Sequence, residues 1–348
     1  MFAPALADER TDMHVVITPT PDGVVAHFKL EHPIDRLVLA YVSNEIDETR
    51  DKTWTLSSPG LTREGSTITS ANGTAFSSFE LEIVPLNEPT SATYPCLFRV
   101  GERGFGLYAG YFVADKTQFA TTIEIQAADG HVVLGFPLDR NAWRVDRAFH
   151  KNAGHRYAYV GPRDYVVEST YARFVVPSGL PRELVELIQT NMDESVRFYT
   201  RKTGRSLSSM PLIIVAANFD HERPGMQGDT TVGPTVALRL FGKPWKSFDS
   251  KSDRLDHGTA HEAAHFWNSD TYRAHRGSPA WMWEGGAEMW TLAVRMDVMK
   301  RFSPDDRRQH IEKALNNCIT SLFDQPLAQP RSGATYACGE TLYWIADA

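Results

Sequence analysis

The period of the apolar residues changes near residue 176, and this change constrains the fold more than any other feature of the chain. Before it, short runs typical of strands recur between turn signals, and after it longer runs at helical spacing dominate. The sequence therefore predicts an α+β protein with a β-rich domain over residues 1–176 and a mainly helical domain over 177–348. A length of 348 residues suits two domains of roughly 150 residues each.

The first region resembles a protein of antiparallel sheets. Its runs are rich in β-branched and aromatic residues and alternate in part between apolar and polar positions. Asn72-Gly73 and Asp129-Gly130 are typical of hairpin turns. These features predict an antiparallel β-sandwich or a curved sheet. The clearest runs are 24–30, 37–42, 79–84, 122–125 and 132–136.

The second region begins with a predicted helix. Apolar residues between Leu184 and Tyr199 recur at helical spacing, Pro181 stands at the start, and Gly204 lies just beyond the end. After this helix we expect a strand, a Gly-rich stretch, a second strand and a largely helical remainder, at 212–215, 224–233, 235–240 and from 253 onward.

The strongest chemical signal is the motif His261-Glu262-Ala263-Ala264-His265. Residues four apart lie on one face of a helix, about 6 Å apart along its axis, so two imidazoles can converge on one ion. Glu262 lies beside this pair, where it can take a proton from a metal-bound water. The motif therefore predicts a metal-dependent hydrolase with Glu262 as general base.

Glu284 is the predicted third ligand. It lies 19 positions after His265, and Ser278-Pro279 before it is typical of a helix start. Two antiparallel helices would bring its carboxylate against His261 and His265. Two histidines, one glutamate and a water form the open four-coordinate zinc site of a hydrolase, so we expect one Zn²⁺.

Other ligand sets fit less well. His257 shares the helix face, but it lies about 12 Å along the axis from His265, too far for both to hold one ion. We expect His257 either to contact a ligating residue without binding the metal itself or to lie on the helix surface. The metzincin extension needs Gly and His where this chain has Asn268 and Thr271, which excludes that class. Glu288 is interpreted as a solvated or pairing acid, with support of the ligands as the alternative.

These residues resemble the gluzincin metallopeptidases of the aminopeptidase N-like family, to which the glycyl aminopeptidases are related. The resemblance rests on the HExxH motif with Trp267 two residues on, on Trp281-x-x-Glu284-Gly285, and on Tyr336-x-x-Gly339. It implies a thermolysin-like peptidase domain over about 178–348, an N-terminal β domain, and a peptide or protein substrate. It also implies that Tyr336 donates a hydrogen bond to the tetrahedral oxyanion.

One element departs from the family pattern. A Gly-x-Met-Glu-Asn strand normally carries a Glu that binds the α-amine of the substrate, and the nearest match here places the neutral Gln227 at that position. Gln227 and Asp229 are the candidate substrate-binding residues, with Glu222 as another acid that can take this role. This departure motivates one alternative, an endopeptidase or other peptidase that does not read a free N-terminus. A second alternative, from a different class, is a non-catalytic zinc-containing binding protein.

Composition limits partners and location. A net charge of −7 gives no reason to expect nucleic acid as a partner, and no apolar run reaches the ~18 residues of a membrane span. Three cysteines without a CxxC pair predict neither a disulfide framework nor a cysteine-only zinc site.

Ala5-Leu6-Ala7 resembles a signal-peptidase site, which predicts a periplasmic or secreted protein; otherwise the protein is cytoplasmic. Family members also carry a further helical domain after the position of Tyr336.

Overall fold

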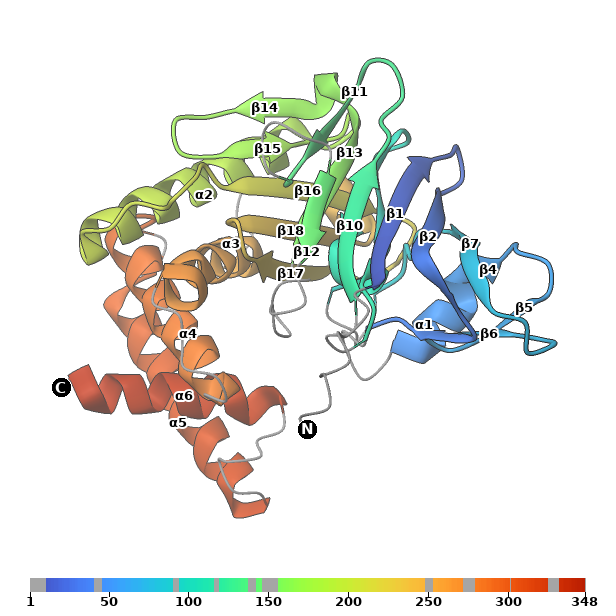
Figure 1. Cartoon of the computed structure of the whole chain (residues 1–348). Helices are drawn as coiled ribbons and strands as arrows, with labels where there is room; N and C mark the ends of the chain where they lie inside the picture. The colour runs from blue at the N-terminus through green and yellow to red at the C-terminus, as the bar shows by residue number, and fades with distance from the viewer. Residues whose placement is uncertain are drawn as a thin grey trace. The chain divides into compact units, whose positions relative to one another are not determined.

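The structure is a computed structural model of the whole chain (Figure 1). It divides into two compact units, Met1–Tyr165 and Val166–Ala348, which are described separately below. The described residues are 11–40, 46–89, 94–115, 119–136, 142–145, 156–247, 253–271, 279–300, 302–324 and 332–347.

The first unit is built from three sheets and the short helix α1 (Ile46–Thr53). In spatial order, the six-stranded sheet holds β12 (Ala142–Val145), β10 (Phe119–Ile125), β1 (Thr11–Pro19), β2 (Val24–Ile34), β7 (Phe76–Ile83) and β4 (Trp54–Leu56). The four-stranded sheet holds β11 (His131–Leu134), β13 (Tyr157–Pro162), β9 (Gly104–Tyr108) and β8 (Leu97–Val100). The three-stranded sheet holds β3 (Arg36–Val38), β6 (Thr67–Ser70) and β5 (Leu61–Glu64).

The β character of this unit follows from alternation along its strands. In β2, alternate residues are buried, and Phe28 stacks on its cross-strand neighbour Phe79 in β7 with ring centroids 4.4 Å apart. The prediction of antiparallel pairing holds with one exception, because β1 and β10 run parallel.

The two predicted hairpin turns connect strands of different sheets. Gly73 and Gly130 do adopt the positive φ of tight turns, at 75° and 77°. The turn at Asn72-Gly73 leads from β6 to β7, and the turn at Asp129-Gly130 leads from β10 to β11. In both cases the two connected strands belong to different sheets and are not hydrogen-bonded to each other. The prediction of hairpins was therefore wrong, because a turn signal fixes the local reversal and not the partner of the strand that follows.

The second unit contains a five-stranded mixed sheet. Its spatial order is β14 (Val166–Glu168), β15 (Arg173–Val175), β16 (Leu212–Asn218), β18 (Thr235–Phe241) and β17 (Gly225–Thr231). Since β15 pairs in parallel with β16, the strands from 166 to 175 belong to this unit, although the sequence assigned them to the first domain. The division after Tyr165 therefore lies before the predicted boundary at 176.

The predicted Gly-rich stretch is the edge strand β17. It pairs antiparallel with β18 over seven residues, from Gly225 opposite Phe241 to Thr231 opposite Thr235. Glycine weakens the sequence signal for a strand, but it allows close approach of another element. At Gly228 this approach is real, because a Cβ there would collide with the side chain of Glu262.

Five helices complete the second unit (Figure 1). The core lies between α2, α3, α4 and the inward side chains of β16 and β18, and includes Ile213, Leu238 and Trp267. Helix α2 ends as predicted, with Gly204 in the left-handed conformation. The helices are α2 (Arg182–Thr203), α3 (Asp253–His265), α4 (Ala280–Asp297), α5 (Pro304–Asp324) and α6 (Ser332–Asp347), and a π-helical turn, Phe266–Thr271, follows α3.

A disulfide joins the last two helices. Cys318 in α5 and Cys338 in α6 are bonded, with their Cα atoms 4.6 Å apart, while Cys96 is a buried free thiol. The sequence predicted no disulfide framework, and one bond corrects that interpretation, because the pairing depends on how α5 packs on α6 and not on spacing along the chain.

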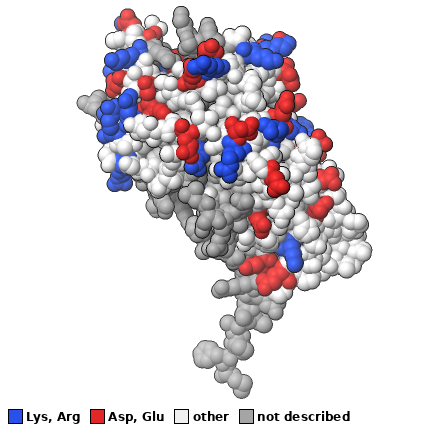
Figure 2. All heavy atoms as spheres, turned by 90° about the horizontal axis from the view of Figure 1, so that it is seen from above, with Lys and Arg blue, Asp and Glu red and all other residues white. Residues whose placement is uncertain are grey.

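The described surface shows no concentration of one charge on the face seen in Figure 2, where basic and acidic side chains are interspersed. Among the helices in the described part of the chain, none has the length and apolarity needed to cross a membrane.

Candidate metal centre

Helix α3 carries the HExxH motif in the core of the second unit. Its residues from Gly258 to His265 are all buried. Two polar contacts fix it against α2: the Asn191 side-chain amide donates to Asp256 at 2.8 Å, and the Tyr199 hydroxyl donates to the Ala260 carbonyl at 3.0 Å. The helix is therefore held on the side opposite its histidines, which project toward α4.

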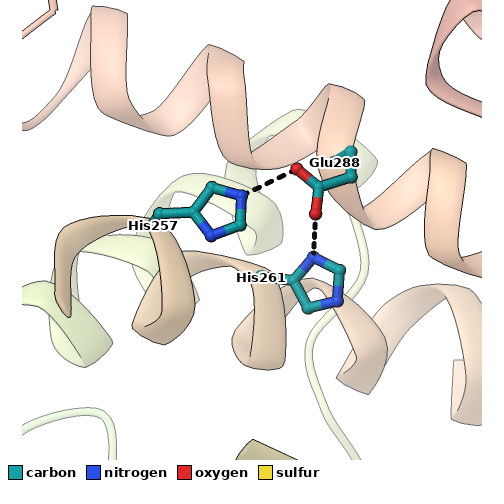
Figure 3. Close-up of side chains that lie close together, drawn as sticks. All are labelled: His257, His261 and Glu288. Carbon is teal, nitrogen blue, oxygen red and sulfur yellow. Dashed lines mark hydrogen bonds and ion pairs between the residues drawn. The ribbon is translucent and has the colours of Figure 1, made fainter. Parts of the chain in front are cut away.

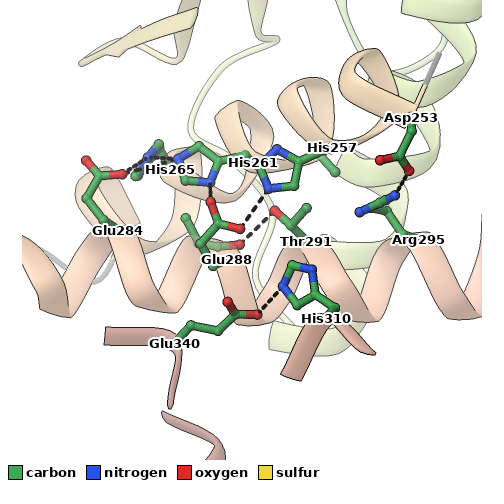
Figure 4. A network of polar contacts seen from close by, with 12 residues as sticks. Asp253, His257, His261, His265, Glu284, Glu288, Thr291, Arg295, His310 and Glu340 are labelled. Atoms are coloured by element: carbon green, nitrogen blue, oxygen red, sulfur yellow. Dashed lines mark hydrogen bonds and ion pairs between the residues drawn. The ribbon is translucent and has the colours of Figure 1, made fainter. Parts of the chain in front are cut away.

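Glu284, in the first half of α4, completes a three-residue cluster with His261 and His265 (Figure 4). The Nε2 atoms of the two histidines lie 3.1 Å apart. Oε2 of Glu284 lies 3.2 Å from Nε2 of His261 and 3.3 Å from Nε2 of His265. The three atoms form a nearly equilateral triangle, so the structure brings together the three residues that the sequence proposed as ligands.

This triangle has the dimensions of a zinc site. In tetrahedral coordination with metal–ligand distances of about 2.0 Å, neighbouring ligand atoms are about 3.3 Å apart. The observed separations of 3.1, 3.2 and 3.3 Å match that value. Two imidazole nitrogens and one carboxylate oxygen also form the donor set of open, catalytic zinc sites. The residues present therefore fit Zn²⁺.

The electrostatics of the cluster favour a positive charge at its centre. Burial alone would raise the pKa of Glu284, but hydrogen bonds to His261 and His265 outweigh it and hold the pKa well below its ordinary value. Burial alone would lower the pKa of His261, but Glu284 and Glu288 raise it well above its ordinary value. A divalent cation between these groups satisfies the same attraction.

Glu288 supports the cluster by contacting the second ring nitrogen of His261 (Figure 3). One turn after Glu284 in α4, it is buried and places Oε1 3.1 Å from Nδ1 of His261 and Oε2 2.7 Å from Nε2 of His257. A carboxylate on the second nitrogen of a ligating histidine fixes the ring orientation and raises its basicity. Glu288 is therefore a pairing acid and not a solvated one, and its contact with His261 agrees with the alternative that it supports the proposed ligands.

We expect the substitution Glu288→Gln to weaken zinc binding about 10- to 100-fold, because the amide loses the negative charge that orients His261. Competition with a chromophoric zinc chelator measures this dissociation constant without any assay of activity. Glu312→Gln, at an exposed position of α5, is the matched control and should bind zinc like the unmodified protein. Equal zinc affinity for both variants would contradict the role given to Glu288.

Glu262 lies on the other side of the histidines, against the edge strand β17. The Thr230 hydroxyl donates to Oε2 of Glu262 at 2.7 Å, and Gly228 leaves room for the carboxylate. Burial raises the pKa of Glu262 above its ordinary value, while His261 and His265 lower it. A carboxylate with a raised pKa, held by one hydroxyl beside a metal cluster, is suited to take up and release a proton.

Tyr336 lies near the cluster in the first half of α6. Its ring centroid is 5.7 Å from that of His261, and 38% of the residue is exposed. Burial, followed by the charges of Glu284, Glu262 and Glu288, raises its pKa, so the hydroxyl remains protonated. The backbones of α6 and α4 meet closely here, because Cβ atoms on Gly285 or Gly339 would collide with the opposite helix.

Gln227 and Asp229 do not join the cluster. Alternate residues of β17 face opposite sides, and Gly228 and Thr230 face Glu262, so the side chains at 227 and 229 leave on the other face of the sheet. The Asp229 carboxylate is buried and paired with Arg239. Glu222, the other acid considered for the substrate amine, is exposed and paired with Lys243.

The predicted helix start lies in the link between α3 and α4, and four tryptophans lie in or near these helices. The helix-start residue Ser278 lies outside the described residues, and α4 begins directly after Pro279. Trp267 is fully buried, and Trp290 packs against the same core, each with its ring 5.4 Å from Tyr199. Trp281 and Trp283 are only partly buried and lie outside that core.

The fold is similar to that of an aminopeptidase N family protein of known structure. An aminopeptidase N family protein from Idiomarina loihiensis superposes with a TM-score of 0.61 at 11% sequence identity, covering 96% of this chain and 66% of that one. Leukotriene A4 hydrolase from Saccharomyces cerevisiae gives a TM-score of 0.47 at 12% identity, covering 97% of this chain and 58% of that one. The chain thus spans less than two thirds of the length of these structures. No protein-family model and no curated protein matches it.

Proposed function

We propose that the protein is a zinc-dependent peptide hydrolase in which His261, His265 and Glu284 hold one Zn²⁺. The observation that carries the proposal is the triangle of donor atoms with sides of 3.1 to 3.3 Å, with the Glu262 carboxylate next to it on the same helix. The fold shared with an aminopeptidase N family protein supports it. Peptides or proteins are the proposed substrates.

Zinc and the residues around it have separate roles in the proposed hydrolysis. Zinc, when bound, supplies Lewis acidity that polarises the scissile carbonyl and acidifies water. Glu262 accepts the proton of the attacking water and passes it to the leaving amine, and Thr230 holds its carboxylate for both transfers. The Tyr336 hydroxyl, protonated because its pKa is raised, donates a hydrogen bond to the oxyanion.

A library of internally quenched peptides, incubated with the zinc-loaded protein, tests this proposal. We expect cleavage that stops on removal of zinc by a chelator and returns when zinc is added back. One equivalent of bound zinc without cleavage of any peptide would contradict the proposal and favour the alternative of a non-catalytic binding protein.

A second candidate concerns the mode of cleavage, and the ion pair of Asp229 with Arg239 favours it. An aminopeptidase needs a negative group for the substrate ammonium. Asp229 and Glu222 are engaged with basic side chains, and the residue at 227 is neutral. We therefore propose a peptidase that does not require a free N-terminus.

Matched peptides with free and acetylated N-termini decide between the two modes. We expect kcat/KM values within about threefold of each other, because no charged contact to the amine is lost on acetylation. A preference of 100-fold or more for the free peptides would show that an amine site exists and would reject this candidate.

The disulfide bears on location. Disulfides persist in oxidising compartments, whereas the cytosol keeps thiols reduced. The bond between Cys318 and Cys338 therefore supports our proposal, made first from Ala5-Leu6-Ala7, of a periplasmic or secreted protein.

A further inference from the structure

The interface between α5 and α6 depends unusually on its disulfide. The buried cluster between these helices consists of small side chains: Cys318, Ala334, Ala337 and Cys338. Four large apolar residues of α5 do not add to it, because they are exposed. The interface also holds a contact between the rings of His310 and Trp344, with centroids 6.2 Å apart, and the covalent bond reinforces it. The exposed residues are Leu315, Ile319, Leu322 and Phe323.

The other side of α6 faces α4 and the metal centre. Tyr336, Gly339 and Tyr343 follow one another at helical spacing on this side. A Cβ on Gly339 would collide with the backbone of α4, and a Cβ on Gly286 would lie 3.3 Å from the ring of Tyr343. A contact between two glycines fixes how near the helices lie. Around this contact, the Tyr343 ring lies against Gly286, and the buried Glu340 carboxylate lies near Glu288 of α4.

The disulfide adds a covalent constraint on the side of α6 that faces α5. Cys338 lies two residues after Tyr336, about 200° around the helix and about 3 Å along its axis. The two side chains therefore leave α6 on nearly opposite sides, and a rotation that moves one moves the other by a similar arc. The hydrogen-bonded pair of His310 and Glu340, at 2.9 Å, is a second link to α5, but it is not covalent.

We propose that the Cys318–Cys338 disulfide is a positioning device for Tyr336: it fixes the rotation of α6, so that loss of the bond lowers turnover through misplacement of the Tyr336 hydroxyl. This inference rests on the proposed function, because turnover of a peptide reports it. The zinc ligands lie on α3 and α4, so the bond has no part in holding them.

The test replaces both cysteines in the zinc-loaded enzyme. In the double variant Cys318→Ala/Cys338→Ala we expect kcat to fall about 10- to 100-fold, the range for a catalytic group displaced by about 1 Å. KM should change by less than about twofold, and one equivalent of zinc should remain bound, since the ligands are untouched. Cys96→Ala, which removes the free thiol in the first unit, is the matched control and should retain full kcat.

A double-mutant cycle separates positioning from a general loss of stability. In a Tyr336→Phe background, loss of the disulfide should lower kcat by less than twofold, because the hydroxyl on which the bond acts is already absent. An unchanged kcat in the double cysteine variant would overturn the proposal. So would an equal fall of kcat with and without the Tyr336 hydroxyl.

If the double variant does not fold, reduction of the folded Cys96→Ala enzyme replaces it. A water-soluble phosphine breaks the S–S bond, each sulfur leaves with a proton, and the phosphine becomes its oxide with the oxygen of water. We expect the same fall in kcat, no such fall in the Tyr336→Phe background, and recovery of kcat on reoxidation. Unchanged turnover would overturn the proposal. A native enzyme that cleaves no peptide would instead contradict the proposed function, and this assignment with it.

Discussion

Replacement of Glu262 by Gln should lower kcat about 10²- to 10⁴-fold and leave zinc binding intact. Gln has nearly the same shape as Glu but cannot accept a proton, so the variant loses general-base catalysis, which accounts for rate factors of that size. Glu262 is not part of the ligand triangle, and the Thr230 hydroxyl can still contact the amide oxygen. The measurements are kcat on a cleaved peptide and zinc content per chain.

A matched control separates this effect from a general change of charge. Glu183→Gln removes one carboxylate from an exposed position in the first turn of α2 and should leave both quantities unchanged. Turnover by the Glu262→Gln variant at the level of this control would exclude Glu262 as the base, whatever its zinc content.

Replacement of Glu284 by Ala should remove both the zinc and the activity. The substitution takes away one of three protein ligands and the negative charge that balances the cation, so a site of two histidines remains. After dialysis against a weak chelator, we expect far less than one equivalent of zinc per chain and turnover below detection. Inductively coupled plasma mass spectrometry measures the metal.

Folding must be checked separately in this variant. Without metal, the Glu284→Ala variant should have a lower thermal midpoint than the native protein, because it loses the ion pairs with His261 and His265, but it should still unfold in one cooperative transition. The native protein alone should gain stability from added zinc, since a ligand that binds only the folded state raises its midpoint. An equal gain in both proteins would place the zinc elsewhere.

The three residues of the cluster could be predicted from the sequence because local geometry nearly determines which side chains meet. Spacing of four residues on a helix brings His261 and His265 to one face, whatever the rest of the fold. Glu284 required only one further assumption, an antiparallel second helix. The strand β16 and the end of α2 at Gly204 were likewise predicted from local periodicity and a local stop signal.

The remaining features depend on how separate elements pack. Helix spacing puts Glu288 on the same face of α4 as Glu284, but its contact with both His261 and His257 depends on how closely α4 packs on α3. The Gly-rich strand β17 lacks a clear apolar pattern, and one of its glycines, Gly228, makes room for Glu262. The pairing of Cys318 with Cys338 joins two helices through their tertiary contact. Each of these three features depends on which residues come together in the folded protein, and spacing along the chain does not determine that.

In the proposed site, His261, His265 and Glu284 surround one zinc ion. Diffraction data collected just above and just below the zinc absorption edge test it most directly, because the anomalous difference locates zinc alone. We predict one peak, about 2.0–2.2 Å from Nε2 of both histidines and from a carboxylate oxygen of Glu284. A peak on any other group of residues, for instance between His257 and Glu288, or no peak in zinc-loaded crystals, would contradict the account.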